Sequence, residues 1–77
     1  MGLSKQLFKF FSTELKKALS YDKDLKVEVD EEKRHIYVRE TDSETIYGTT
    51  LRTIMSALPE RYFSFYVSEG KIVIYCK

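Results

Sequence analysis

Apolar and polar positions in the first half of the chain follow a helical period and then a strand period. Over residues 3–20 the apolar side chains recur three or four positions apart, which is typical of one face of an amphipathic α-helix. Residues 25–29 alternate apolar and polar side chains, and residues 35–39 do the same after a charged turn. This alternation predicts two half-buried strands that are joined as a β-hairpin.

The second half begins with another helical pattern, which is the weaker of the two. Thr41 and Glu44 have the spacing of a capping box, so we expect the helix to start at Thr41. Asp42 and Ser43 are alternative caps. The pattern contains several threonines, which are poor helix formers, so we expect this helix to be the less stable one. Pro59 ends it, because the residue before a proline is pushed out of the helical region.

Two further alternating stretches, at residues 62–67 and 71–77, predict a second hairpin. Phe63, Phe65 and Val67 are expected to point inward in the first of these strands. Glu69 and Gly70 lie between the two stretches, and they have the composition of a tight turn with positive φ, which glycine adopts without strain.

The order helix, strand, strand therefore occurs twice, over residues 3–40 and 43–77, in a chain that we expect to form a single domain over residues 1–77. We predict an α+β fold of order αββαββ, in which two helices pack on one face of a four-stranded antiparallel sheet as a two-layer sandwich. The repeat is one of architecture, and descent from a duplication is a hypothesis. The expected core residues are Leu7, Phe8, Phe11, Leu15, Leu19, Val27, Val29, Ile36, Val38, Ile46, Leu51, Ile54, Leu58, Phe63, Phe65, Ile72 and Ile74.

Composition narrows the classes of function. Among the 77 residues, 13 are Lys or Arg and 12 are Asp or Glu, so the net charge of +1 indicates neither a nucleic acid nor an anionic membrane as partner unless charge is concentrated in a patch. The single cysteine, Cys76, has no partner for an internal disulfide, so we expect a reducing, cytoplasmic environment. The chain has no apolar run of about 18 residues, so we expect no membrane span.

The polar positions of the predicted strands fall on the sheet face that the helices leave uncovered. This face is rich in tyrosine and in cations, although the chain as a whole is nearly neutral. We expect it to be the binding surface of the protein. Its candidate binding residues are Lys26, His35, Tyr37, Arg39, Tyr62, Tyr66, Lys71, Tyr75 and Lys77, and Val73 is expected to point outward beside them.

Three interpretations of this face stay open. One is contact with a protein partner or a second copy of the chain, because interfaces favour Tyr and Arg and place Lys at their rim; an exposed strand edge is a further route to self-association. Another is single-stranded nucleic acid, whose bases stack on aromatic rings while cations meet the phosphates. The last is a solvated face without a ligand, because tyrosine pairs stabilise strands on their own.

The residues usual for catalysis or metal binding are scarce. His35 is the only histidine and has no nucleophile or inward carboxylate near it in the pattern. Glu40, Asp42 and Glu44 suit helix capping better than metal binding. Gly-rich phosphate loops and nucleophile elbows do not occur. We therefore expect a non-catalytic binding module that needs no cofactor, metal ion or small-molecule substrate and that acts through protein–protein contact or self-association, with single-stranded nucleic-acid binding as the alternative.

Overall fold

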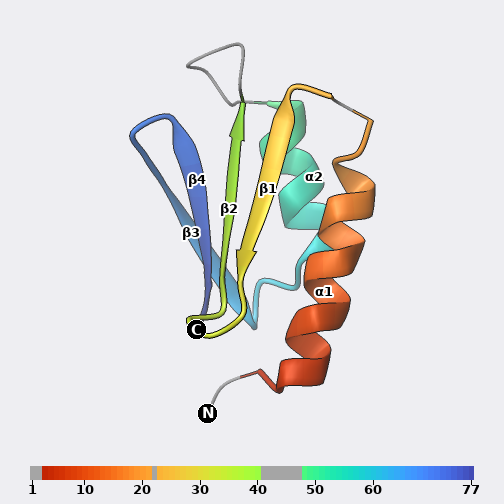
Figure 1. The fold of residues 1–77 in the computed structure, drawn as a ribbon, viewed down its shortest axis with the longest axis vertical. Coiled ribbons are helices and arrows are strands. Elements are labelled where there is room, and N and C mark those ends of the chain that lie inside the picture. Colours follow the sequence, from red (N-terminus) through yellow and green to blue (C-terminus); the bar gives the residue numbers. More distant parts are fainter. Residues whose placement is uncertain (1–2, 22, 41–47) are drawn as a thin grey trace.

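The structure of the chain is a computed structural model that describes residues 3–21, 23–40 and 48–77, without the side chain of Glu40. Two helices and four strands follow one another in the order helix, strand, strand, twice, which confirms the predicted α+β class and element order (Figure 1). The elements are α1 (Lys5–Ala18), β1 (Leu25–Asp30), β2 (His35–Glu40), α2 (Thr49–Ala57), β3 (Phe63–Ser68) and β4 (Lys71–Cys76).

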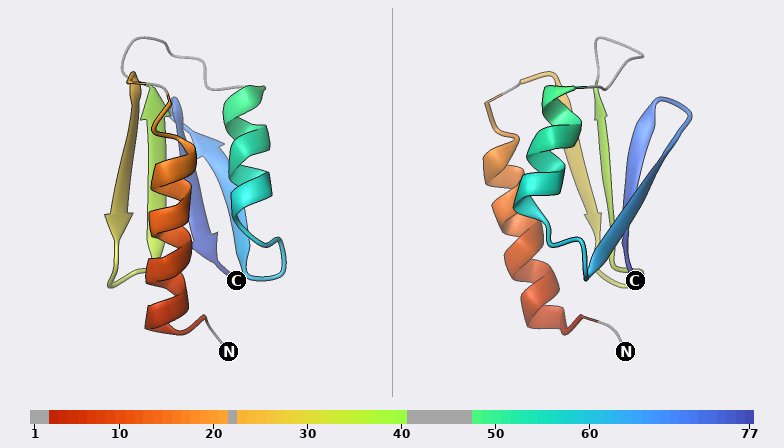
Figure 2. Two further views of the ribbon diagram at one scale, coloured as in Figure 1. Left: turned by 90° about the vertical axis from the view of Figure 1, so that its right-hand side faces the viewer. Right: turned by 180° about the vertical axis from the view of Figure 1, so that it is seen from behind.

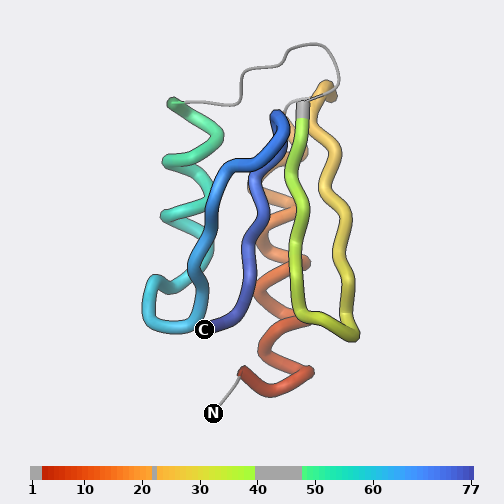
Figure 3. Tube along the Cα trace, turned by 90° about the vertical axis from the view of Figure 1, so that its left-hand side faces the viewer, coloured from red at the N-terminus to blue at the C-terminus, as the bar shows by residue number. Residues whose placement is uncertain are grey.

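The four strands form one antiparallel sheet in the order β1-β2-β4-β3, so the two hairpins meet at their second strands and β1 and β3 are the edges. Figure 2 shows both helices on the same side of the sheet, with α1 across its middle and α2 beside β3. Figure 3 views the sheet from the other side, where the strands lie in front and both helices lie behind them.

The core lies between the helices and the middle of the sheet. Ile36 and Val38 of β2 pair with Ile74 and Ile72 of β4, and all four side chains are at most 1% exposed. From the helices, Leu15 and Ile54 reach the same cluster and are equally buried. The alternating pattern of these two strands therefore predicted the centre of the core correctly.

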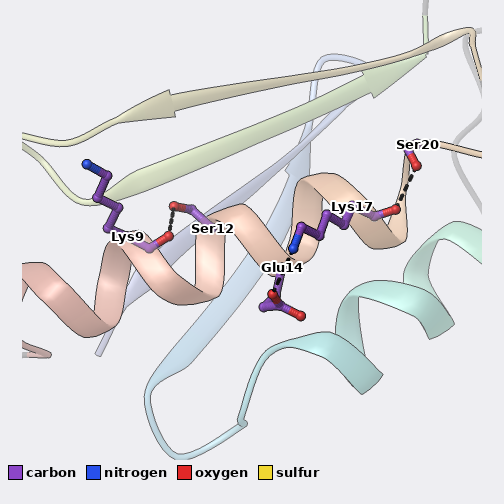
Figure 4. Close-up of polar contacts among 5 residues, drawn as sticks. All are labelled: Lys9, Ser12, Glu14, Lys17 and Ser20. Carbon is purple, nitrogen blue, oxygen red and sulfur yellow. Dashed lines mark hydrogen bonds and ion pairs between the residues drawn. The ribbon is translucent and has the colours of Figure 1, made fainter.

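Helix α1 is capped and internally bonded by short polar side chains. The Ser4 hydroxyl accepts a hydrogen bond from the Leu7 amide at 3.2 Å, which caps the first turn. Figure 4 shows the Ser12 and Ser20 hydroxyls donating to carbonyls of the same helix three residues earlier, at 3.1 Å and 2.8 Å. It also shows an ion pair of 3.7 Å between Lys17 and Glu14 on the exposed side.

Two positions on α1 differ from the pattern-based expectation. Ser12 is polar, yet its side chain is buried; it meets its hydrogen-bonding need within the helix and can therefore face the sheet. The expectation that Leu7 lies in the core is wrong, because its side chain is 44% exposed. The buried stripe runs through Phe8, Ser12 and Leu15, which leaves Leu7 at its side, and Leu3 is buried beneath it instead.

Helix α2 begins later than predicted. Gly48 precedes its first residue and has φ of 62°, a left-handed conformation that an α-helix cannot continue through, so α2 starts at Thr49 and not in the early forties. The proposed capping box at Thr41 and Glu44 and the expected core residue Ile46 lie outside the described residues. The helix ends at Ala57, just before Pro59, as expected.

The outer strand β3 is less covered than its alternating pattern predicted. Phe63 is buried, but Phe65 and Val67 are 37% and 49% exposed, so the expectation that Phe65 lies in the core is wrong. Figure 2 shows the physical reason: hairpin β3–β4 leans away from α2 towards its turn, so the helix layer covers only the beginning of β3. The turn itself is as predicted, with positive φ at both Glu69 and Gly70.

Candidate interaction surface

The sheet face turned away from the helices is called here the tyrosine face. Side chains of a strand alternate between the two sides of a sheet. The strand residues that alternate with the core residues, and that the register pairs with one another, therefore belong to this face. Its members on the four strands are Lys26, Glu28, Asp30, His35, Tyr37, Arg39, Ser64, Tyr66, Ser68, Lys71, Val73 and Tyr75.

Four aromatic rings form a continuous arc across the middle of this face. His35 lies between Tyr37 and Tyr75, with ring centroids 6.0 Å and 6.5 Å away, and its Nδ1 is 3.2 Å from the Tyr37 hydroxyl. Tyr75 in turn lies 6.0 Å from Tyr66. All three ring pairs are tilted or edge-on, a geometry that stabilises each pair by about 0.5–1.5 kcal/mol. The arc is therefore held in place before any partner binds.

Val73 lies inside this arc. The register places it on the tyrosine face as predicted, between Tyr37 of β2 and Tyr66 of β3. Its side chain is nevertheless only 4% exposed, which corrects the expectation that it is open to solvent. The flanking rings cover it, so this face has a small apolar centre of its own.

Three cations cross one end of the tyrosine face in a row, called here the cation row. Lys26 of β1 is opposite Arg39 of β2, and Arg39 is opposite Lys71 of β4. Like charges that face one another across strands destabilise a sheet. Within the described part of the chain, no ion pair between one of these three cations and a carboxylate is seen. Lys71 instead places its ammonium 5.2 Å from the centre of the Tyr37 ring.

Carboxylates gather at the other end of β1. Glu28, Asp30, Glu31 and Glu32 border a shallow hollow that Tyr37 and Lys71 also line. The Asp30 carboxylate accepts hydrogen bonds from the amides of Glu32 and Lys33, both at 3.1 Å, and so it is held in the turn. The tyrosine face is therefore basic at one end and acidic at one corner.

The structure separates two predicted binding residues from the others. Tyr62 was expected to point outward, but it packs against the core with its ring 6.3 Å from that of Phe11 of α1. It precedes β3, where the chain returns from α2, so the alternation of the strand does not yet govern its direction. Lys77 follows β4 at the end opposite Lys71 and borders a groove between α2 and β3, and its amide donates to the Tyr62 carbonyl at 2.9 Å. The remaining predicted residues, Lys26, His35, Tyr37, Arg39, Tyr66, Lys71 and Tyr75, share the tyrosine face.

A groove between α2 and β3 was not anticipated from the sequence. It has a volume of about 230 Å³ and is lined mainly by apolar side chains, among them Met55, Leu58, Phe63 and Phe65. Met55 is 65% exposed although it belongs to the apolar stripe of α2. One sign of the groove in the sequence is the width of the apolar stripe of α2, which exceeds what a short helix can bury beside an edge strand. The alternating pattern does not reveal which strand is the edge, so it does not predict where the groove lies.

Cys76 ends β4 as a half-buried free thiol. Burial raises the pKa of the Cys76 thiol, and the nearby Arg34 guanidinium lowers it by a smaller amount. Within the described ranges, no three His, Cys, Asp or Glu side chains are grouped so that they could hold a metal ion. None of the described helices is both long and apolar enough to span a membrane.

Comparison of the chain with models of protein families, with curated proteins and with solved structures found no match.

Proposed function

We propose that this protein is a non-catalytic binding module that contacts a protein partner, a second copy of the chain included, through its tyrosine face. The arrangement of two helices on one side of the sheet supports the proposal, because it leaves the other side open. The observation that carries it is the cation row beside the aromatic arc: three mutually opposed cations, none paired with a carboxylate among the described residues, next to four rings and the covered Val73.

The chemistry of this surface favours a partner that carries carboxylates. Tyr and Arg are enriched in protein interfaces, whereas Lys is found at the rim, and Lys26 lies on an edge strand. Carboxylates placed opposite Lys26, Arg39 and Lys71 would relieve the repulsion within the row. The rings contribute contact area at low entropic cost, because their packing against one another already limits their rotamers.

A photocrosslinking residue in place of Tyr37 tests this proposal. Tyr37 lies on an inner strand at the middle of the tyrosine face, so p-benzoylphenylalanine there reports on that face alone. In cells, irradiation is expected to give a discrete adduct that protease removes and nuclease does not, and that is lost when Arg39→Ala and Lys71→Ala are added. The matched control places the same residue at Lys16, which is exposed on α1. Equal adducts from positions 37 and 16, or none from either, would contradict the proposal.

Single-stranded nucleic acid is the second candidate, and the cation row is the observation that favours it. Lys26, Arg39 and Lys71 are spaced by adjacent strands and suit a line of phosphates. The rings support it less well: the Lys71 ammonium lies over Tyr37, and the three ring pairs are inclined by 54° to 81° and do not form a parallel stack. Tyr66, 52% exposed, is the most open platform.

Salt dependence separates the two candidates. If fluorescent single-stranded DNA or RNA binds through the three cations, the logarithm of affinity falls with the logarithm of salt concentration with a slope of about −2, at about −0.7 per contact. Tyr66→Ala is then expected to weaken binding with little change in the melting temperature. Absence of binding at tens of micromolar protein in low salt would exclude nucleic acid.

A further inference from the structure

The two edges of the sheet differ in how they are protected against the addition of another strand. Natural edge strands are usually blunted by charged side chains, and β1 carries three, at Lys26, Glu28 and Asp30. Strand β3, with the sequence FSFYVS, carries none, and it consists of aromatic, β-branched and serine residues that favour strands. Figure 3 shows β3 as the outer strand on the side of α2. The edge at β3 therefore lacks the usual protection.

The backbone of β3 also offers free hydrogen-bonding groups. The Lys77 amide donates to the Tyr62 carbonyl, so this carbonyl faces β4, whereas the Tyr62 amide is used in the preceding turn by the Pro59 carbonyl. Amide and carbonyl directions alternate along an antiparallel strand, so those of Ser64, Tyr66 and Ser68 also face β4. The amides and carbonyls of Phe65 and Val67, and the carbonyl of Phe63, consequently point away from the sheet.

The side chains beside these free groups are apolar and uncovered. Phe65, Val67 and Met55 are 37%, 49% and 65% exposed, and Met55 and Phe65 border the groove between α2 and β3. An added strand that continued the sheet would lie along this groove and would bury all three side chains. Backbone pairing and apolar burial thus favour the same position for a partner strand.

We propose that β3 pairs with β3 of a second copy of this chain, antiparallel about a two-fold axis through Phe65, so that the two four-stranded sheets become one. In this arrangement the two Phe65 residues exchange both of their backbone hydrogen bonds. Each Val67 amide donates to the Phe63 carbonyl of the other copy. The two Phe65 side chains meet on the helix side of the joined sheet, next to the two grooves.

The flanking charges select both the partner and the register. In a continuous sheet, residues that face the helices must lie opposite residues that do the same, so the two-fold axis passes through a residue and not between two. With the axis at Phe65, the register continued past both ends of β3 brings Arg61 opposite Glu69 of the second copy, and this pair occurs twice. With the axis at Tyr66, Arg61 lies opposite Lys71. The strand is therefore complementary in charge to itself in the first register and repulsive in the second.

This inference goes beyond the function proposed for the tyrosine face, because it uses a different surface and is tested independently. A single added strand per copy buries less area than a stable interface of about 1,200–2,000 Å², so we expect a weak, concentration-dependent dimer. Sedimentation equilibrium should show a mass that rises from 9.1 kDa towards twice that value as concentration increases. A mass that stays at 9.1 kDa up to about 1 mM overturns the proposal.

A charge-reversal cycle tests the register. Arg61→Glu and Glu69→Arg are each expected to weaken the dimer about five-fold, because each places like charges opposite one another twice. The double variant is expected to restore the wild-type constant to within about two-fold. Residues 61 and 69 flank the two ends of β3 in one copy, and the strand between them alone spans about 17 Å, so a coupling between them arises only between copies. Additive effects of the two changes would exclude this register.

A charge within the strand tests the edge itself. Val67→Lys is expected to weaken the dimer at least about ten-fold while the melting temperature of the dilute protein stays nearly unchanged, because Val67 is half exposed. Thr13→Lys is the matched control: it introduces the same side chain and also raises the net charge by one, but at an exposed position of α1, and it should leave the dimer intact. A dimer that survives Val67→Lys, or that is lost in Thr13→Lys, would show that β3 is not the interface.

Discussion

Phe63 and Phe65 allow the coverage of β3 to be measured, because they are the same residue two positions apart on the same side of one strand. Phe63 is 5% exposed, and its ring lies 6.4 Å from that of Phe8 and 5.7 Å from that of Phe11. Replacing it with alanine removes both aromatic pairs and leaves a cavity in the core, so Phe63→Ala should cost about 3–5 kcal/mol of unfolding free energy.

Phe65→Ala should be much milder in the monomer. Phe65 is 37% exposed, so roughly two thirds of the stabilisation from full burial applies, which is about 1–2 kcal/mol of unfolding free energy. Removal of its ring opens no enclosed cavity, so no further cost is expected. In a domain of this size 1 kcal/mol shifts the melting temperature by about 4–8 °C, so the two variants should differ by at least about 4 °C.

The assay is thermal unfolding followed by circular dichroism at low micromolar concentration, with a urea titration to give the free energies. Equal destabilisation by Phe63→Ala and Phe65→Ala under these conditions would refute the structural reasoning, because it would mean that both rings are equally buried in the monomer. If the cost of Phe65→Ala grows with protein concentration while that of Phe63→Ala does not, the additional burial comes from a second copy.

Three further changes test local features. Ser4→Ala should cost about 1 kcal/mol in a urea titration, because it removes the hydroxyl that accepts from the Leu7 amide, whereas Ser4→Asp should not. Glu69→Asn should raise the unfolding free energy by about 0.5–1 kcal/mol, since Glu69 has φ of 52° and asparagine tolerates this conformation better; a loss of stability would speak against the turn. Burial raises the pKa of the Cys76 thiol above its value in the unfolded chain. The thiol therefore contributes to the unfolding free energy in full below the pKa of the unfolded state, and this contribution is lost as pH rises through the pKa of the folded state. Cys76→Ser should therefore remove this alkaline decline when the unfolding free energy is measured against pH. The native thiol should also react more slowly with a thiol reagent at pH 8 than the urea-unfolded thiol does.

The sequence predicted those features that depend on periodicity along a single element. The alternation in β2 and β4 identified the four most buried strand residues, and the helical stripe identified Phe8 and Leu15. These positions are central, so whichever element packs against them buries them. Periodicity was therefore sufficient to predict the α+β class and those residues of the tyrosine face that lie within the strands, but not the positions of Tyr62 and Lys77, which flank them.

The errors lie where burial depends on a neighbouring element. Phe65 and Phe63 have the same pattern, and only the lean of the β3–β4 hairpin away from α2 distinguishes them. Val73 reads as an exposed position, but the order β1-β2-β4-β3 places a tyrosine on each side of it. Strand order and hairpin curvature are properties of the assembled sheet, and the alternation within one strand carries no information on either.

The central pair β2–β4 has a consequence for how the chain folds. Each hairpin closes over a short loop, and such closures take microseconds, but the paired residues Ile36 of β2 and Ile74 of β4 are 38 positions apart in the sequence. Their association closes the longest loop in the sheet and must wait until both hairpins have met, so we expect it to set the folding rate. Truncation of Ile74 to Val should then slow refolding, whereas truncation of Val29 at the outer strand β1 to Ala should mainly accelerate unfolding.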